Sequence, residues 1–278
     1  MMDLNRVIVL DLASLGMGEG PDANRFNSVN ADTIGHLDAS YADRVVVPTL
    51  IDLGLGNIRW DNPLAHIPEV STSRGFYGKM CSKVNSASVN SGLREMFDFN
   101  ASTRTLSIFD LLARQFNNVS IIASFANYLE NQNINNSVQV PDDSKAFIEL
   151  SNKLNSQHDG FIYCQPPELK SYAKAKDADG YVRQLNWLDG KIQSLCETLE
   201  REDLLIITAN FANDPTYQGQ QITREYLPLL IYTSSIEHGR SLGIKRSSGV
   251  IASTILDVFG LYDADTMENP SLLHNLEN

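Results

Sequence analysis

The chain has 278 residues, of which 42% are hydrophobic, and its formal net charge is −12 at pH 7. These values fit one globular domain over residues 1–278, and the acidic balance argues against a nucleic-acid surface, which needs clustered Lys and Arg. The first apolar run is short and has no basic leader, so we expect no signal peptide and no membrane span, and three separated cysteines favour a reducing, cytoplasmic location.

The first expected strand covers residues 6–13 and carries Asp11 toward its carboxyl end. Ligands of open α/β sheets bind beyond the carboxyl ends of the strands, which places Asp11 at the mouth of a site. The next loop, residues 16–23, is rich in glycine. It lacks the Gly-Lys-Ser/Thr ending of a phosphate-binding loop and the spacing of a dinucleotide-binding loop, so by itself it predicts only a turn.

Apolar residues at helical spacing predict helices over residues 103–116, 141–154, 177–199 and 247–261. Ser247 or Ser248 is the expected N-cap of the last of these helices. Residues 118–128 begin as a strand and residues 160–165 form another strand. The Asn-rich residues 130–138 are expected to form a loop.

Residues 204–232 contain two buried strands with a polar loop between them. The loop opens with Asp-Pro at residues 214–215 and closes with Thr-Arg-Glu at residues 223–225. We interpret Asp214, Arg224 and Glu225 as an ion network that braces this loop. The first strand leads to Asn210 and Phe211, which offer little for acid, base or metal chemistry.

Several motifs resemble the phosphopentomutases, a branch of the alkaline phosphatase superfamily whose members move phosphate between two hydroxyls of ribose or deoxyribose. The matching motifs are Leu-Asp at 10–11, Gly-x-Gly at 16–18, Pro-Asp-Ala at 21–23, Ala-Asp-Thr-x-Gly-His at 31–36, Leu-Gly-Leu-Gly-Asn-Ile at 53–58, Gly-Lys at 78–79, Asp-x-x-Gly-Tyr at 177–181, Asp-Pro-Thr at 214–216 and Thr-Arg-Glu at 223–225. The resemblance implies a three-layer α/β/α sandwich with a mostly parallel central sheet. The family's cap domain is absent near residues 98–104.

The resemblance also implies six metal-ligand positions and a requirement for manganese, but only Asp11 keeps a ligand side chain. The other five positions hold Leu169, Lys174, Asn210, Phe211 and Ile222. A two-metal site needs several converging carboxylates and imidazoles, and lysines at 170, 174 and 176 would repel a dication. We therefore expect no bound metal and no cofactor.

The phosphate-carrying threonine of the family falls on Val89, whose side chain cannot attack phosphorus. Ser88 and Ser91 lie close to it in the sequence. A shift of one residue in the alignment would make a serine the nucleophile.

These losses predict a pseudoenzyme, and our first hypothesis is a protein-interaction or assembly role. The partner would be another protein or a second copy of the chain, on a face that includes Phe211, Ile222 and Tyr226. A second hypothesis is a metal-independent module for a nucleotide or sugar phosphate. Its vestigial pocket would contain Asp11, Ser88, Ser91, Lys174, Asn210, Thr216 and Arg224. A third hypothesis is residual phosphopentomutase or phosphate-ester metalloenzyme activity.

Overall fold

One sheet runs through the computed structural model, which describes residues 3–277 apart from 87, 98–106, 117, 129–133, 135 and 220–221. The strands of the described residues are β1 (Arg6–Asp11), β2 (Phe76–Met80), β3 (Val119–Ala123), β4 (Asn136–Gln139), β5 (Gly160–Gln165), β6 (Asp203–Thr208), β7 (Leu227–Tyr232) and β8 (Ser241–Lys245). Their order across the sheet is β4-β3-β5-β1-β6-β7-β2-β8. Neighbouring strands are parallel except at β7, which runs antiparallel to β6 and β2.

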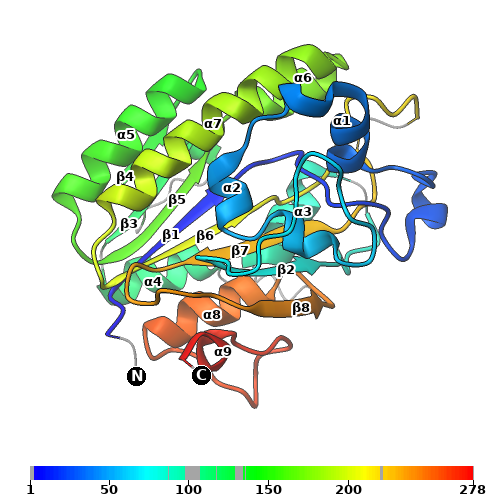
Figure 1. Cartoon of the computed structure of the whole chain (residues 1–278). Helices are drawn as coiled ribbons and strands as arrows, with labels where there is room; N and C mark the ends of the chain where they lie inside the picture. Colours follow the sequence, from blue (N-terminus) through cyan, green and yellow to red (C-terminus); the bar gives the residue numbers. More distant parts are fainter. Residues whose placement is uncertain are drawn as a thin grey trace.

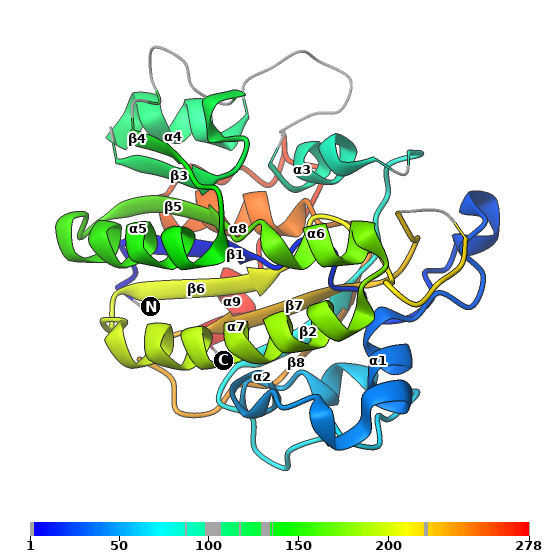
Figure 2. The same ribbon diagram turned by 90° about the horizontal axis from the view of Figure 1, so that it is seen from above.

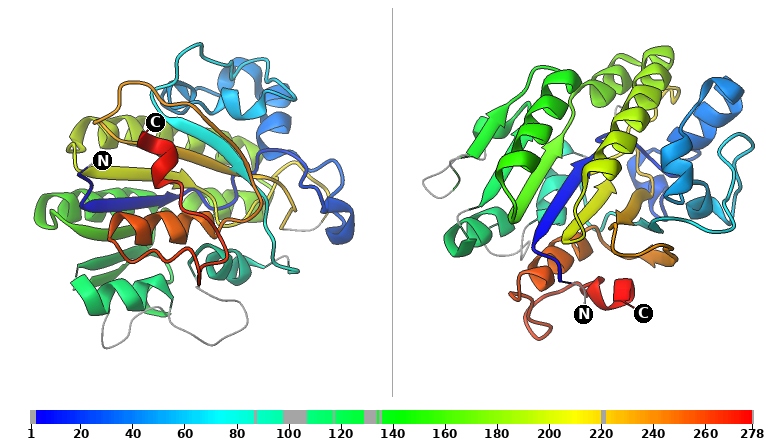
Figure 3. Two further views of the ribbon diagram at one scale, coloured as in Figure 1. Left: turned by 90° about the horizontal axis from the view of Figure 1, so that it is seen from below. Right: turned by 60° about the vertical axis from the view of Figure 1, so that its left-hand side comes forward.

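Helices cover both faces of the sheet (Figure 1, Figure 2). One layer contains α1 (Thr33–Tyr41), α2 (Pro48–Asp52), α5 (Asp143–Ser156), α6 (Glu168–Ala175) and α7 (Ala178–Thr198). The other contains α3 (Val89–Phe97), α4 (Ile108–Phe116), α8 (Val250–Val258) and α9 (Leu273–Glu277). The views from below and from the side show the sheet between these layers (Figure 3). The predicted three-layer α/β/α sandwich with a mostly parallel sheet is therefore confirmed.

The central strands are buried along their whole length because helices lie on both of their faces. β1, β5, β6 and β7 have no exposed residue, which explains their unbroken apolar sequences. Short 3-10 helices connect several of the elements: η1 (Ala23–Phe26), η2 (Ala42–Arg44), η3 (Gly56–Arg59) and η4 (Ala126–Tyr128).

A buried ion pair joins the amino-terminal ends of β1 and β6. Arg6 and Asp203 are register partners, and the Nε and Nη2 atoms of Arg6 each donate to the Asp203 carboxylate at 2.6 Å. Nη1 of Arg6 donates to the carbonyls of Leu154 and Gln157, at 2.8 and 2.6 Å. Both side chains of the pair are almost fully buried, so the arginine ties the end of α5 to two strands.

Three predicted elements need correction or lie partly outside the described residues. Residues 136–138, expected to lie in a loop, belong to the edge strand β4, which pairs with β3. The predicted serine cap of the last helix is wrong: the N-cap is Gly249, and the Ser247 hydroxyl donates to Glu95 at 2.8 Å. The helix predicted over 103–116 is α4 from Ile108 onward. Its expected start, and the expected cap deletion near residues 98–104, fall outside the described residues.

No helix in the described ranges combines the length and the apolar character that crossing a membrane requires. The longest helix, α7, has 21 residues and carries several charged residues.

Candidate functional site

Asp11 lies at the carboxyl end of β1, where the strands of the parallel half of the sheet end together (Figure 1). Its side chain is completely buried. Oδ2 accepts hydrogen bonds from the Tyr163 hydroxyl at 2.7 Å and from Nε2 of Gln165 at 2.8 Å. Oδ1 accepts from the backbone N–H of Asn210 at 3.0 Å. Three donors from the two neighbouring strands therefore hold the one carboxylate that the resemblance assigns to metal binding.

Parallel pairing explains why these donors converge. β5 and β6 flank β1, so Tyr163 and Gln165 arrive from one side and Asn210 follows the strand on the other side. Gln165 also donates to the Tyr163 hydroxyl at 3.0 Å and to Oδ1 of Asn210 at 3.4 Å. Burial raises the pKa of Asp11, and the hydrogen bonds from Tyr163 and Gln165 oppose that rise.

Lys170 on α6 supplies the positive charge nearest to this network. Its ammonium group donates to Oε1 of Gln165 at 2.5 Å and to the Ser124 hydroxyl at 3.2 Å. It also lies 5.1 Å from the centre of the Phe125 ring. Burial lowers the pKa of Lys170 below its ordinary value, and the negative charge of Asp11 opposes this shift. A fixed ammonium group thus stands beside Asp11 in the part of the site where the family resemblance implies a metal.

The remaining ligand positions hold groups that suit a protein core or a surface. Leu169 is buried in the hydrophobic core, and Lys174 is exposed on α6, so it does not share the burial of Lys170. Phe211 is 8% exposed and Ile222 is half-buried. Val89 is the first residue of α3, and its side chain lies outside the described part.

The predicted vestigial pocket has almost no open space. Ser88, Ser91, Asn210 and Arg224 line a cavity of about 20 Å³ together with Phe211 and Ile222. Such a volume holds about one water molecule. The Ser88 and Ser91 hydroxyls lie 2.8 Å apart and bond to each other. Asp11, Lys174 and Thr216 do not line this cavity.

Arg224 and Glu225 do not form the ion network with Asp214 that we predicted. Nε and Nη2 of Arg224 each donate to the carboxylate of Asp22 at 2.9 Å, and Nη2 also donates to two backbone carbonyls at residues 82 and 84. Glu225 accepts from the Thr33 N–H at 2.7 Å and from the Thr223 hydroxyl at 2.5 Å. Burial raises the pKa of Glu225 to about 7. The network prediction missed these partners because they lie between 140 and 202 residues away in the sequence or involve hydroxyl groups.

Asp214 holds the start of α1 and its own loop. It bonds to Nδ1 of His36 at 2.6 Å and accepts from the Asp32 N–H at 3.2 Å. The Thr216 hydroxyl donates to it at 2.7 Å, so Thr216 braces the loop. Burial alone would raise the pKa of Asp214, but hydrogen bonds from Thr216 and His36 hold it below its ordinary value. Sequence analysis gave no role to His36.

The residues present do not fit a pair of manganese ions. A two-metal centre needs several anionic or imidazole ligands around each ion. The carboxylate of Asp11 already accepts three hydrogen bonds, and the other ligand positions hold hydrocarbon, amide and ammonium side chains. Within the described ranges, no group of three or more His, Cys, Asp or Glu side chains is arranged to hold a metal.

Comparison with known proteins assigns the chain to a family. The pattern of the Metalloenzyme superfamily matches residues 5–263, so the chain belongs to this superfamily. Phosphopentomutase of Alkaliphilus oremlandii is 30% identical over 162 residues, a match that covers 58% of this chain and 42% of the relative. Phosphopentomutase of Levilactobacillus brevis is 23% identical over 398 residues, which cover 99% of this chain and 100% of the relative. The chain thus spans less than half the length of the first of these relatives.

Solved structures show the same fold at low sequence identity. A protein in the alkaline phosphatase superfamily from Vibrio parahaemolyticus has a TM-score of 0.55 at 11% identity, covering 93% of this chain and 67% of that chain. A TAB5 alkaline phosphatase mutant with bound Mg has a TM-score of 0.54 at 10% identity, covering 95% of this chain and 100% of that chain. The resemblance to phosphopentomutases and to the alkaline phosphatase fold is confirmed.

Proposed function

We propose that this phosphopentomutase-like protein does not transfer phosphate and acts by binding a protein partner, either a different protein or a second copy of itself. The observation that carries the proposal is that Tyr163, Gln165 and the Asn210 N–H occupy three of the roughly four acceptor sites of the Asp11 carboxylate. A metal ligand at this position must be free to coordinate a cation. Both acceptor sites of Oδ2 are instead taken by Tyr163 and Gln165.

Replacing the network by a metal would be costly. Coordination through Oδ2 would leave the buried Tyr163 hydroxyl without its acceptor, and an unsatisfied buried polar group costs about 1–3 kcal/mol. The cation would also approach the Lys170 ammonium group. No second carboxylate among the family's ligand positions offsets these costs, since those positions hold Leu169, Asn210, Phe211 and other neutral or cationic residues.

The choice of a protein over a small phosphate ligand rests on space. The cavity beside Asn210 and Ser91 is about 20 Å³ in volume, whereas pockets for small ligands occupy roughly 300–1,000 Å³. Phe211 fills this region and is nearly buried, so it does not offer the docking surface that we expected of it. Ile222 lines this cavity, is half-buried and supports a contact there, whereas the half-buried Tyr226 does not line it.

A direct assay tests the loss of activity. Purified protein with manganese is given ribose 1-phosphate and a generic phosphate ester, and the Asp11→Ala variant serves as the background control. We expect equal signals from the two proteins. Turnover by the wild type above the variant would support residual phosphopentomutase or phosphate-ester activity instead.

A second experiment tests the partner. Light scattering after size-exclusion chromatography reports whether the chain self-associates, and reciprocal co-purification from the native host reports a different partner. Substitution of Ile222 by Asp should weaken whichever association is found. A monomer that co-purifies with nothing in either direction would contradict the interaction role.

A further inference from the structure

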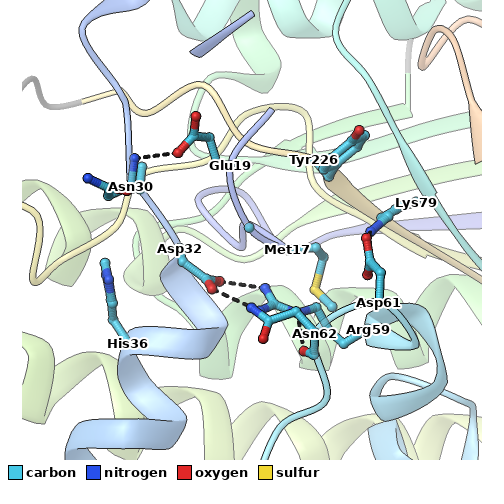
Figure 4. A pocket seen from close by; sticks show the side chains of 12 residues that line it. Met17, Glu19, Asn30, Asp32, His36, Arg59, Asp61, Asn62, Lys79 and Tyr226 are labelled. Atoms are coloured by element: carbon cyan, nitrogen blue, oxygen red, sulfur yellow. Dashed lines mark hydrogen bonds and ion pairs between the residues drawn. The ribbon is translucent and has the colours of Figure 1, made fainter. Parts of the chain in front are cut away.

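A second cavity, separate from the Asp11 network, lies beside the amino-terminal end of α1 (Figure 4). Its volume is about 380 Å³, within the range of small-molecule pockets. None of the residues of the predicted vestigial pocket lines it. Its walls come from the glycine-rich loop after β1, the start of α1, the segment after η3, β2 and the residue before β7. Segments far apart in the sequence therefore build one polar hollow.

The cations of this cavity are already neutralised. Nη1 and Nη2 of Arg59 donate to the two carboxylate oxygens of Asp32 at 2.6 and 2.8 Å. The Lys79 ammonium group donates to Asp61 at 2.9 and 2.8 Å. The Arg59 and Lys79 side chains are only 3% and 4% exposed. A ligand that displaced Asp32 or Asp61 would therefore leave a buried cation without its counter-charge. Glu19 adds a third carboxylate to the lining, which leaves no surplus positive charge for a phosphate.

Three other side chains that line the cavity have donors and acceptors available for a ligand. Among the described residues, the side-chain amides of Asn30 and Asn62 and the hydroxyl of Tyr226 form no hydrogen bond. Asn30 and Asn62 are exposed, and Tyr226 is half-buried. Amides and hydroxyls both donate and accept, as do the hydroxyl groups of a sugar or a polyol. The half-buried Tyr226 ring adds apolar surface for the C–H groups of such a ligand.

The cavity is also held in shape before any ligand binds. Asp32 caps α1 by accepting from the Gly35 N–H at 3.0 Å while it holds Arg59. Nε of Arg59 donates to the Asn62 carbonyl at 3.1 Å. Gly18 has a φ of 98°, and a side chain there would meet Nη1 of Arg59 at 2.6 Å. Preorganised polar groups lower the entropy that binding must overcome.

We propose that this cavity binds a neutral, polyhydroxylated small molecule, of the chemical class of a free monosaccharide or a cyclitol. Paired charges and unused amides recognise hydroxyl groups, and the acidic lining disfavours a phosphorylated ligand. The proposal concerns residues outside the Asp11 network, so it stands or falls independently of the loss of phosphoryl transfer.

The test titrates the whole chain with D-ribose, D-glucose and myo-inositol, and in parallel with D-glucose 6-phosphate and inorganic phosphate. Amide chemical shifts or calorimetry report binding. We expect at least one neutral probe to bind, and the phosphorylated probe to bind at least about tenfold more weakly, which corresponds to about 1.4 kcal/mol. Failure of all three neutral probes at their highest soluble concentration, or a preference for the phosphorylated probe, overturns the proposal.

Variants locate the binding. Asn30→Gly and Asn62→Ala remove exposed amides. Glycine suits the φ of 65° at position 30, so both variants should leave the fold intact, which circular dichroism checks. Each should weaken the neutral probe by about fivefold to tenfold, since a lost hydrogen bond is worth about 1 kcal/mol. The matched control is Asn24→Ala, at an exposed asparagine on η1 that does not line the cavity. Equal affinities in all three variants would assign the binding to another place and refute the assignment of this cavity.

Discussion

The phenol of Tyr163 donates a hydrogen bond to Asp11 across 2.7 Å, and both side chains are completely buried. The donor comes from β5 and the acceptor from β1, which lie next to each other in the sheet. Burial raises the pKa of Tyr163 well above its ordinary value, so the phenol stays protonated and keeps its hydrogen for Asp11. The carboxylate that the family resemblance assigns to metal binding thus has a permanent hydrogen-bond donor in Tyr163.

Removal of this phenol should destabilise the fold. Tyr163→Phe deprives Asp11 of one of its three donors and should lower the free energy of unfolding by about 1–2 kcal/mol. Urea unfolding measures the change. Tyr217→Phe is the matched control, because its exposed hydroxyl bonds only to the carbonyls of Asn27 and Val29 at 3.1 Å. The control should change stability by less than about 0.5 kcal/mol. Equal losses of unfolding free energy in the two variants would show that the hydrogen bond from Tyr163 to Asp11 contributes no more than an exposed one.

Metal affinity should appear only when ligands are put back. Wild-type protein should show no saturable binding of manganese by calorimetry or by the electron paramagnetic resonance of Mn²⁺. The combined variant Asn210→Asp, Phe211→His and Ile222→His should bind manganese at least about tenfold more tightly than the control, because it adds a carboxylate and two imidazoles. Alanine at the same three positions is the control. Two manganese ions bound tightly by the wild type would refute our assignment of an inactive site.

The buried ion pair between Arg6 and Asp203 should contribute strongly to stability. Arg6→Met leaves the Asp203 carboxylate buried without its partner and should cost about 3–5 kcal/mol, as measured by urea unfolding. Adding Asp203→Leu should recover part of this loss, because no buried charge then remains. Arg44→Met is the control, since Arg44 and Asp179 form an exposed pair, each more than half exposed. Such exposed pairs contribute about 0–1 kcal/mol.

Glu225 should make stability depend on pH near neutrality. Its pKa rises from the ordinary 4.5 to about 7 in the folded chain, so the native state holds its proton more tightly than the unfolded state does. Its stabilising contribution is therefore complete below about pH 4.5 and is lost as the pH rises through 7. The unfolding free energy of the wild type relative to Glu225→Gln should fall by about 3 kcal/mol across this window.

Using Glu225→Gln as the reference cancels the pH dependence of stability that other buried acids contribute. Asp143, whose pKa burial raises to about 6, titrates in the same range in both proteins. Unfolding is followed by urea titration at several pH values. A difference between the two proteins that stays constant from pH 4.5 to above 7 would show that the Glu225 proton does not couple to folding.

Much of the fold could be predicted from the sequence because its signals are local. The apolar runs that became β1, β5 and β6 need only burial on both faces, and the stripe of Leu185, Leu188 and Ile192 places one face of α7 on the sheet. β4 escaped prediction because Asn136, Ser137 and Gln139 are polar. An edge strand of half-exposed residues carries no apolar run.

The candidate site was predictable only in part. Residue types alone indicate that Asn210, Phe211 and Ile222 are poor metal ligands. The network around Asp11 depends on β5 lying next to β1, which the sequence does not state. Within one helix, Lys170 turns toward Gln165 while Lys174, one turn later, is exposed. A signal that was available is the alternation of Tyr163 and Gln165, which places both on one face of their strand.

In the loop between β6 and β7, the side chains that anchor the loop differ from those at the family's ligand positions. Asp214, Arg224 and Glu225 fasten it to His36, Asp22 and Thr33, whereas positions 210, 211 and 222 are those that matched the family's ligands. Substitution in the second group leaves the contacts of the first group untouched, so the side chains at positions 210, 211 and 222 can vary without loosening the loop. The chemistry at this end of the sheet can therefore diverge among related chains while the backbone of the loop keeps its position.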